Sequence, residues 1–278
     1  MATTKTLKVE KLTSTVGAEV LDVDLDRIRN DEELPGAVME ALEEHGILAF
    51  RGLNIDDDAQ VAFCRKLGEI VPFPTQKVPE IFIVSLDPEK NPLAEYLKAT
   101  VYWHIDGTSD PVPAKATFLS AKVIAAQGGE TEFASTYAAY DDLSGEEKER
   151  FAKLRVLHNQ VGIQSLVHPN PTPEQLEEWR KKSHEHPLVW THASGRKSLV
   201  IGQTVDYVIG MDEDEGRALL NDLNERATTS DRVYRHVWTD GDTILWDNTG
   251  VVHRVQPYDP GSRREMHRTT LAGDEPIQ

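Results

Sequence analysis

Short apolar runs separated by turn residues recur along most of the chain, and they set the predicted architecture. Most runs combine β-branched and aromatic residues with polar ones, and "GILAFRG" is continuously apolar at its centre, as in a buried strand. The runs predicted as strands are "GILAFRG" (46–52), "EIFIVSL" (80–86), "VYWHID" (101–106), "KATFLSAKVI" (115–124), "ETEFAS" (130–135), "HPLVWTH" (186–192), "KSLVIG" (197–202), "RVYRHVWT" (232–239), "DTILWD" (242–247), "VVHRVQ" (251–256) and "EMHRTTLAG" (265–273).

Other segments repeat their apolar residues every three or four positions, which predicts amphipathic helices. These segments are residues 33–45, 57–67, 136–153, 173–183 and 212–227. Residues 87–100 are polar and contain Pro88 and Pro92, so we expect a loop there. Many short strands with helices between them predict a mainly β fold, such as a sandwich, jelly roll or barrel, with flanking helices packed outside it.

No internal repeat, low-complexity tract or long linker divides the sequence, so residues 1–278 are predicted to form a single domain. One stretch stands out by composition, because "HPNPTPEQLEEWRKKSHEHP" (168–187) is rich in proline and charge. Such an insertion forms either a lid over a pocket or a surface excursion. The sequence leaves both alternatives open.

The composition excludes several classes of partner. A net charge of −17 argues against nucleic acid, because phosphate binding requires a basic surface. No stretch approaches the ~20 apolar residues that cross a bilayer, and no apolar core follows the first lysines, so neither membrane insertion nor secretion is expected. The single cysteine, Cys64, fits a reducing compartment, and we expect a cytoplasmic protein.

The stretch "VYWHIDGTSD" (101–110) contains the first candidate chemistry. In a strand, His104 and Asp106 project from the same face, which suits either an ordinary hydrogen-bonded pair or part of a metal site. His253, in "WDNTGVVHRVQPY", is the natural third ligand. Two histidines and one carboxylate form the facial triad that leaves positions free on Fe(II) for a co-substrate and oxygen.

Two arginines in "SRREMHRTTLAG" add a second signal. Strand parity puts Arg264 and Arg268 on one face, and a buried arginine is costly unless an anion meets it. The planar guanidinium binds a carboxylate bidentately. We therefore interpret the pair as clamps for two anions, or as one clamp and one structural ion pair; both could also be paired with internal Asp or Glu.

Several other polar residues are interpreted as structural. Five histidines have no zinc-motif spacing and are expected to be solvated or capping residues: His158, His168, His184, His186 and His192. Asp247, in "WDN", is interpreted as a turn residue rather than a ligand.

Five ordered motifs carry a family resemblance. These are "WHIDGT", "GGETEFASTYAAYDDLS", "HPLVWTHASGRKSLVIG", "GDTILWDNTGVVHRV" and "RREMHRTTLAGDEP". From about residue 8 to 276 the chain resembles the taurine dioxygenase and 2,4-dichlorophenoxyacetate dioxygenase (TauD/TfdA) family of Fe(II)- and 2-oxoglutarate-dependent oxygenases. The resemblance implies a double-stranded β-helix (jelly-roll) core.

The resemblance also assigns roles to residues. It implies that His104, Asp106 and His253 bind Fe(II), and that Thr131 and Arg264 hold the distal carboxylate of 2-oxoglutarate. Arg268 matches the family's second arginine, near the acid group of the substrate. Relatives place substrate contacts in the stretches that contain Lys77 and Tyr102, although an exposed lysine is usually only solvated.

The expected activity is therefore hydroxylation of a small anionic substrate with 2-oxoglutarate and O2 as co-substrates. The candidate substrates are aryloxyalkanoate-like carboxylates, sulfonates and sulfate esters, with C–O or C–S cleavage where the hydroxylated carbon bears the heteroatom. The carboxylate of Asp106 favours hydroxylation, since halogenating relatives lack it. "VPFPTQKV" (71–78) holds no histidine where taurine enzymes place a substrate-binding one, which puts taurine itself in doubt.

Two alternatives to an oxygenase remain at this point. One is a zinc-dependent jelly-roll hydrolase, and the other is a non-catalytic jelly-roll binding protein. A homo-oligomer, either a dimer or a tetramer, is also compatible with the sequence.

Overall fold

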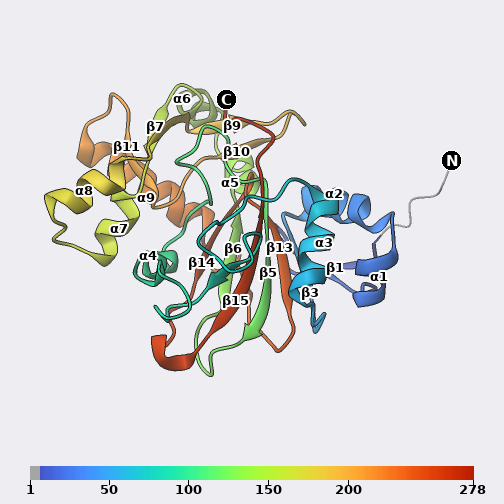
Figure 1. Ribbon diagram of the computed structural model, residues 1–278. Helices are drawn as coiled ribbons and strands as arrows, with labels where there is room; N and C mark the ends of the chain where they lie inside the picture. The colour runs from blue at the N-terminus through green and yellow to red at the C-terminus, as the bar shows by residue number, and fades with distance from the viewer. Residues whose placement is uncertain (1–6) are drawn as a thin grey trace.

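The computed structural model describes residues 7–278, and its largest element is a seven-stranded sheet (Figure 1). All neighbouring strands in this sheet are antiparallel except β2 and β3, which are parallel. In spatial order the strands are β1 (Val9–Lys11), β2 (Ala18–Val20), β3 (Ile47–Phe50), β13 (Thr243–Asp247), β5 (Ala116–Val123), β15 (Glu265–Leu271) and β4 (Phe82–Val84). We call this the main sheet.

A second, three-stranded antiparallel sheet, here called the small sheet, packs on one face of the main sheet. Its strands are β12 (Tyr234–His236), β6 (Thr131–Ser135) and β14 (Val251–Val255), with β6 in the centre. Phe133 of β6 contacts Trp246 of β13, and their ring centroids are 5.6 Å apart. One apolar cluster joins the two sheets through residues of both.

Alternation along the strands decides which side chains enter that cluster. On β13, Ile244 and Trp246 lie between the sheets, whereas Leu245 faces the opposite side. On β3, Ile47 and Ala49 likewise point between the sheets, and Leu48 does not. This period of two is what the sequence pattern predicted for strands with two different faces.

Helices cover the other face of the main sheet, on the blue side of Figure 1. They are α1 (Leu25–Asn30), α2 (Leu34–His45) and α3 (Asp57–Leu67). The side chain of Asp56 caps α3, and Gly46 ends α2 in the left-handed conformation (φ 71°). Cys64, on the buried face of α3, is a free thiol and packs like a small apolar residue.

Most of the remaining helices and short strands form a layer at the left and top of Figure 1, on the side of the sheets away from α1–α3. Two small antiparallel sheets belong to it, ordered β11–β7–β8 and β10–β9. The elements of this layer are α4 (Ala94–Leu97), η1 (Lys98–Val101), α5 (Thr136–Asp141), α6 (Gly145–Phe151), β7 (Arg155–His158), α7 (Val161–Val167), α8 (Pro173–Arg180), β8 (His184–Pro187), β9 (Val189–Thr191), β10 (Lys197–Leu199), β11 (Val205–Val208) and α9 (Glu213–Ala227). A further short helix, η2 (Pro260–Ser262), comes directly before β15.

The structure corrects several predicted elements. Residues 101–106 do not form a strand, and only His104 makes an isolated bridge there, to His253. The expected loop 87–100 contains α4 and most of η1, and the helix expected at 136–153 is two helices. The second of these starts at a capping box formed by Ser144 and Glu147, which fixes a new N-terminus inside the periodic pattern.

The architecture is therefore a mixture of helices with large antiparallel sheets, somewhat richer in helix than predicted. Within residues 7–278, no helix combines the length and the apolarity that crossing a membrane requires.

His158, at the end of β7, is fully buried, and its surroundings keep it uncharged. Its Nδ1 lies 3.2 Å from the hydroxyl of Thr204, and its Nε2 is buried without a hydrogen-bond partner among the described residues. Burial, with a smaller contribution from His186, lowers the pKa of His158 to about 3. The folded protein therefore holds a neutral imidazole at this position.

Acidification should destabilise the fold through His158. The unfolded chain protonates this imidazole near pH 6.5 and the folded chain only near pH 3, so the unfolded state binds more protons between these values. The free energy of unfolding should then decrease as the pH falls, by about 2 kcal/mol from this residue between pH 7 and pH 5. Urea denaturation of wild type and His158→Gln at both pH values checks whether the variant loses that part of the pH dependence.

Thr204→Val is the matched control, because it removes the hydroxyl contact but keeps the imidazole. It should lower the free energy of unfolding at both pH values and leave the pH dependence as in wild type. An identical pH dependence in wild type and His158→Gln would contradict the assignment.

Candidate metal centre and active-site cavity

Three predicted metal ligands, His104, Asp106 and His253, converge on one point. Their ligand atoms lie within 4.8 Å of one another, and no other such group of histidine, cysteine and carboxylate side chains occurs among residues 7–278. Nε2 of each histidine is 3.8 Å from a carboxylate oxygen of Asp106. The five histidines set aside from the sequence form no metal site of this kind in the described chain.

His104 is positioned by its backbone rather than by a strand. Its N–H donates to the carbonyl oxygen of His253 at 3.0 Å, and the N–H of His253 donates back at 2.9 Å. Nδ1 of His104 donates to the carbonyl oxygen of Tyr102 at 2.8 Å, which leaves the lone pair of Nε2 free to bind a metal. A side chain at Gly202 would meet Cα of His104 at 3.0 Å, so glycine permits this approach.

Asp106 begins a turn at Gly107 and is held by contacts from three directions. The Thr117 hydroxyl donates to Oδ2 at 3.4 Å, and Nη1 of Arg268 lies 3.5 Å from the same oxygen. Burial alone would raise the pKa of Asp106, but Arg268 and the two histidines outweigh it and lower the pKa below its ordinary value. Asp106 is therefore a carboxylate, as metal binding requires.

His253 lies on β14 and packs between aromatic rings. Its ring centroid is 4.8 Å from that of Trp246 and 6.2 Å from that of Phe133. Burial, followed by the nearby His104, lowers the pKa of His253 to about 3, so its imidazole is neutral. Its Nδ1 is buried without a hydrogen-bond partner within residues 7–278, so packing rather than hydrogen bonding orients this ring.

The donor set fits a transition metal. Two imidazoles and one carboxylate meet at one point, and the hydrogen bond from Nδ1 of His104 turns its Nε2 toward the other ligands. This combination suits Fe(II) with coordination positions left open, and it is unlike the closed sulfur-rich sites that hold structural zinc.

A cavity of about 670 Å³ opens beside the metal ligands. His104, Asp106 and Arg268 line it, and Nε of Arg268 is buried without a hydrogen-bond partner in the described chain. Most of the remaining wall is apolar, including Val71, Phe73, Phe82, Leu97, Ile105, Val112 and Ile163. Such a cavity suits a ligand with an apolar body and one acidic group.

Arg264 and Thr131, the predicted co-substrate residues, both lie outside the lining of this cavity. Arg264 is buried (4% exposed), and Nη2 donates to the carbonyl oxygen of Gly129 at 3.0 Å. Its other neighbour is the Tyr258 ring, 4.9 Å from the guanidinium, and no carboxylate of residues 7–278 forms an ion pair with it. The Thr131 hydroxyl accepts from Nε1 of Trp238 at 2.9 Å, so its own proton remains available.

These contacts make the Arg264 group fit an anion. A buried guanidinium without a carboxylate partner is costly, and an anionic ligand removes that cost. The available Thr131 proton supplies a further donor near the start of β6.

The predicted substrate residues Lys77 and Tyr102 lie outside the lining of the cavity. Lys77 is exposed. The Tyr102 hydroxyl donates to the carbonyl oxygen of Leu166 at 3.3 Å. Their proposed contacts with a substrate stay predictions.

Sequence reasoning missed residues that support the site. Trp238 and Asn248 were not identified, although Asn248 donates to Thr117, which in turn donates to Asp106. Gly129 was not identified either, although a side chain there would meet Nε of Arg264 at 2.9 Å. The signal available in the sequence was a glycine two residues before Thr131.

The comparisons with known proteins agree with this geometry. A family model described as "Taurine catabolism dioxygenase TauD, TfdA family" matches residues 8–270. The alpha-ketoglutarate-dependent 2,4-dichlorophenoxyacetate dioxygenase of Cupriavidus pinatubonensis is 34% identical, over 92% of this chain and 94% of that protein. An alkylsulfatase of Acinetobacter baylyi is 31% identical, over 98% and 86% of the two chains.

Solved structures extend the agreement to the fold. The crystal structure of AAD-2 in complex with Mn(II) and N-oxalylglycine superposes with a TM-score of 0.83 at 31% identity, covering 98% of this chain and 100% of the other. A taurine dioxygenase from Burkholderia xenovorans gives a TM-score of 0.79 at 27% identity, with 98% and 91% covered. The predicted family and enzyme class are thereby confirmed: the chain belongs to the TauD, TfdA family and is an iron(II)- and 2-oxoglutarate-dependent dioxygenase.

Proposed function

We propose that this dioxygenase hydroxylates a small anionic organic substrate in the cavity beside His104 and Asp106. The observation that carries the proposal is Arg268, a cation that lines this mainly apolar cavity next to a metal ligand. Relatives named for 2,4-dichlorophenoxyacetate and for sulfate esters support the same class of acid. Aryloxyalkanoate-like carboxylates, sulfonates and sulfate esters are therefore the candidates.

His104, Asp106 and His253 are the residues that would hold iron(II). Bound there, iron(II) supplies the oxidation chemistry, with 2-oxoglutarate and O2 as co-substrates. The chain orients the His104 imidazole through its Nδ1, keeps the His253 imidazole neutral and keeps Asp106 ionised. The Asp106 carboxylate occupies a position that a halide would otherwise take, which favours hydroxylation.

Arg264 and Thr131 are proposed to bind the distal carboxylate of 2-oxoglutarate. The guanidinium provides a planar pair of donors, and the Thr131 hydroxyl provides a third. Trp238 orients that hydroxyl by donating to its oxygen. Burial excludes water from this group, which strengthens the charge-assisted hydrogen bonds.

Arg268 is proposed to bind the acid group of the substrate, with Lys77 and Tyr102 as further substrate contacts. The rings of Phe82 and Phe73 lie 4.7 and 5.6 Å from its guanidinium, and they hold it over the cavity without neutralising it. The apolar walls would hold the substrate body and exclude water from the reacting carbon. Where that carbon bears oxygen or sulfur, hydroxylation would be followed by C–O or C–S cleavage.

We also propose that the two facing sheets form a double-stranded β-helix within a single domain, 1–278, in a cytoplasmic protein. The apolar cluster shared by the main and small sheets supports the first point. Residues 168–187 are proposed as a lid, because Lys182 of this segment lines the cavity and pairs with Asp110 at 2.6 Å. Slower hydrogen exchange of 168–187 on adding substrate would support the lid, and unchanged exchange would oppose it.

Replacing any metal ligand should abolish activity. His104→Ala, Asp106→Ala and His253→Ala each remove one of three proposed ligands, and no fourth histidine, cysteine or carboxylate of the described residues belongs to this group. Succinate formation should fall to background while circular dichroism stays close to wild type. His168→Ala, a histidine outside the site, is the control, and near wild-type turnover by any of the three variants would refute that ligand.

Arg264→Lys should weaken 2-oxoglutarate binding despite the conserved charge. Lysine cannot reproduce the planar fork, and a charge-assisted hydrogen bond contributes on the order of 1.5–3 kcal/mol. The half-saturating concentration of 2-oxoglutarate should rise about ten-fold to a hundred-fold. Arg263→Lys, at the exposed neighbouring position, should leave that concentration unchanged. If the half-saturating 2-oxoglutarate concentration were equal in the two variants, Arg264 would not be part of the co-substrate site.

Arg268→Gln should abolish the preference for anionic substrates. Wild type is expected to turn over an aryloxyacetate far faster than its neutral amide, whereas the variant should treat the two similarly. Because Arg268 also contacts Asp106, iron and 2-oxoglutarate binding must be measured in parallel, and the chromophore of that complex should persist. An anion preference that survives in the variant would remove Arg268 from the substrate site.

A further inference from the structure

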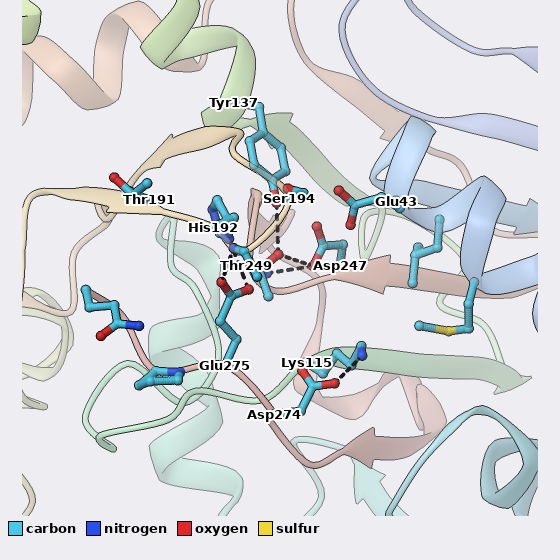
Figure 2. A pocket seen from close by; sticks show the side chains of 15 residues that line it. Glu43, Lys115, Tyr137, Thr191, His192, Ser194, Asp247, Thr249, Asp274 and Glu275 are labelled. Carbon is cyan, nitrogen blue, oxygen red and sulfur yellow. Dashed lines mark hydrogen bonds and ion pairs between the residues drawn. The ribbon is translucent and has the colours of Figure 1, made fainter.

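A second cavity, of about 840 Å³, lies away from the metal ligands and shares no lining residue with the first (Figure 2). Helix α2, the β9–β10 hairpin, the end of β13 and residues 274–278 form its walls. The dioxygenase chemistry uses none of these side chains. We call it the Asp247 cavity, after the buried carboxylate that lines it.

Asp247 is 5% exposed, and its two oxygens are in different situations. Oδ1 accepts from the backbone N–H of Thr249 at 2.8 Å and from its hydroxyl at 2.7 Å. Oδ2 is buried without a hydrogen-bond partner within residues 7–278. In Figure 2 the oxygen without dashed lines points away from Thr249, toward the side of the cavity where Glu43 lies.

Neighbouring hydrogen bonds bring no donor to Oδ2. Because the Thr249 hydroxyl donates its proton to Asp247, the Tyr137 hydroxyl must donate to Thr249, at 3.0 Å. The chain of bonds therefore runs from Tyr137 through Thr249 to Oδ1. A donor for Oδ2 has to come from a molecule in the cavity.

The cations around the cavity are already paired with other acids. Lys115 pairs with Asp274. Arg196 lies 3.3 Å from a carboxylate oxygen of Glu43 and stacks on the Tyr137 ring, 3.7 Å from its centroid.

His192 does not neutralise the remaining acid. It lies 3.5 Å from Glu275, but burial lowers the pKa of this histidine, so it carries no charge at neutral pH. Within residues 7–278, Asp247 and Glu275 therefore remain without an ion pair to a charged lysine or arginine, which leaves an excess of negative charge at the cavity.

The burial that isolates Asp247 also penalises its charge. Burial first, and then the nearby Glu43, raises the pKa of Asp247 to about 6. A bound cation would relieve this penalty, because it would both neutralise the charge and donate to Oδ2.

We propose that the Asp247 cavity binds a small organic cation, an ammonium or guanidinium group with a compact apolar body. The charged head would donate to Oδ2 of Asp247 on the side of Glu43. The apolar body would contact Met39, Leu42 and Pro276, which also line the cavity. A bare metal ion fits less well, because the carboxylates here do not gather within ligand distance of one another.

The test uses benzylammonium and benzylguanidinium as probes, with benzyl alcohol and benzoate as neutral and anionic counterparts. Isothermal titration with the full chain at pH 7.5 should give one saturable site for each cation and none for the two counterparts. Asp247→Asn keeps the shape of the side chain but removes its charge. It should weaken cation binding at least about ten-fold, the size expected from one charge-assisted hydrogen bond.

Two controls separate the Asp247 cavity from other acidic surfaces. Glu44→Gln changes an exposed carboxylate of α2 that does not line the cavity, and it should bind the cations as wild type does. Asp106→Ala removes the carboxylate beside the other cavity and should also leave binding intact. If Asp247→Asn fails to fold, Glu43→Gln, at an exposed position on the rim, should weaken binding several-fold.

Several outcomes would overturn the proposal. Equal binding of benzyl alcohol would show a site that selects shape rather than charge, and loss of binding in Asp106→Ala would assign the cation to the other cavity. Self-association that depends on Asp247, together with no binding of either cation, would mean that a second copy of the chain fills the cavity.

Discussion

The reciprocal backbone hydrogen bonds between His104 and His253 are the constraint on which the active site depends. They join an irregular segment, which no sheet otherwise holds at this position, to a regular strand of the small sheet. These bonds have N···O distances of 3.0 and 2.9 Å. They fix the two backbones side by side, and both imidazoles then face Asp106. Gly202 makes the arrangement sterically feasible, because any side chain at that position would collide with the backbone of His104.

Charges inside this protein divide into those with an internal partner and those without one. Glu132, 2% exposed, accepts from Arg235, Arg254 and Gln256, so it is neutralised within the fold. Arg254 also stacks 4.5 Å from the Trp103 ring and so braces the segment that carries His104. Arg264 and Asp247 are buried to a similar degree, but neither forms an ion pair with another of the described residues. An unpaired buried charge costs free energy, so a ligand of opposite charge is expected to bind at these two positions.

The sequence predicted the regular parts of this fold well, and the reason is local. Helix α3 has the predicted bounds, because Asp56 caps it and Gly68 ends it, and both signals are visible in the sequence. The strands of the main sheet follow the alternation of their own residues. The candidate metal ligands could also be picked out from the sequence, since residue type and spacing limit the alternatives. The structure brings them together, as the family resemblance implied.

Features set by distant contacts could not be predicted in this way. Residues 101–106 have the composition of a strand, but only His104 finds a partner, so the segment remains irregular. The prediction that His104 and Asp106 lie together was therefore correct, but a turn at residues 106–109, not strand alternation, brings them together. Likewise, Asp247 was interpreted as a turn residue from its local sequence, and its burial depends on α2 and the β9–β10 hairpin packing around it.

The end of β13 links the two cavities through three consecutive residues. Trp246 packs against the His253 ring at 4.8 Å, and Asn248 donates to Thr117, which donates to Asp106. Between them, Asp247 faces the second cavity, because strand alternation turns its side chain away from the metal ligands. One short turn therefore fixes the orientation of two metal ligands and carries an unpaired carboxylate on its other side. Because these three residues are consecutive, a substitution that shifts the turn is expected to disturb both the packing on His253 and the hydrogen bond from Asn248 to Thr117.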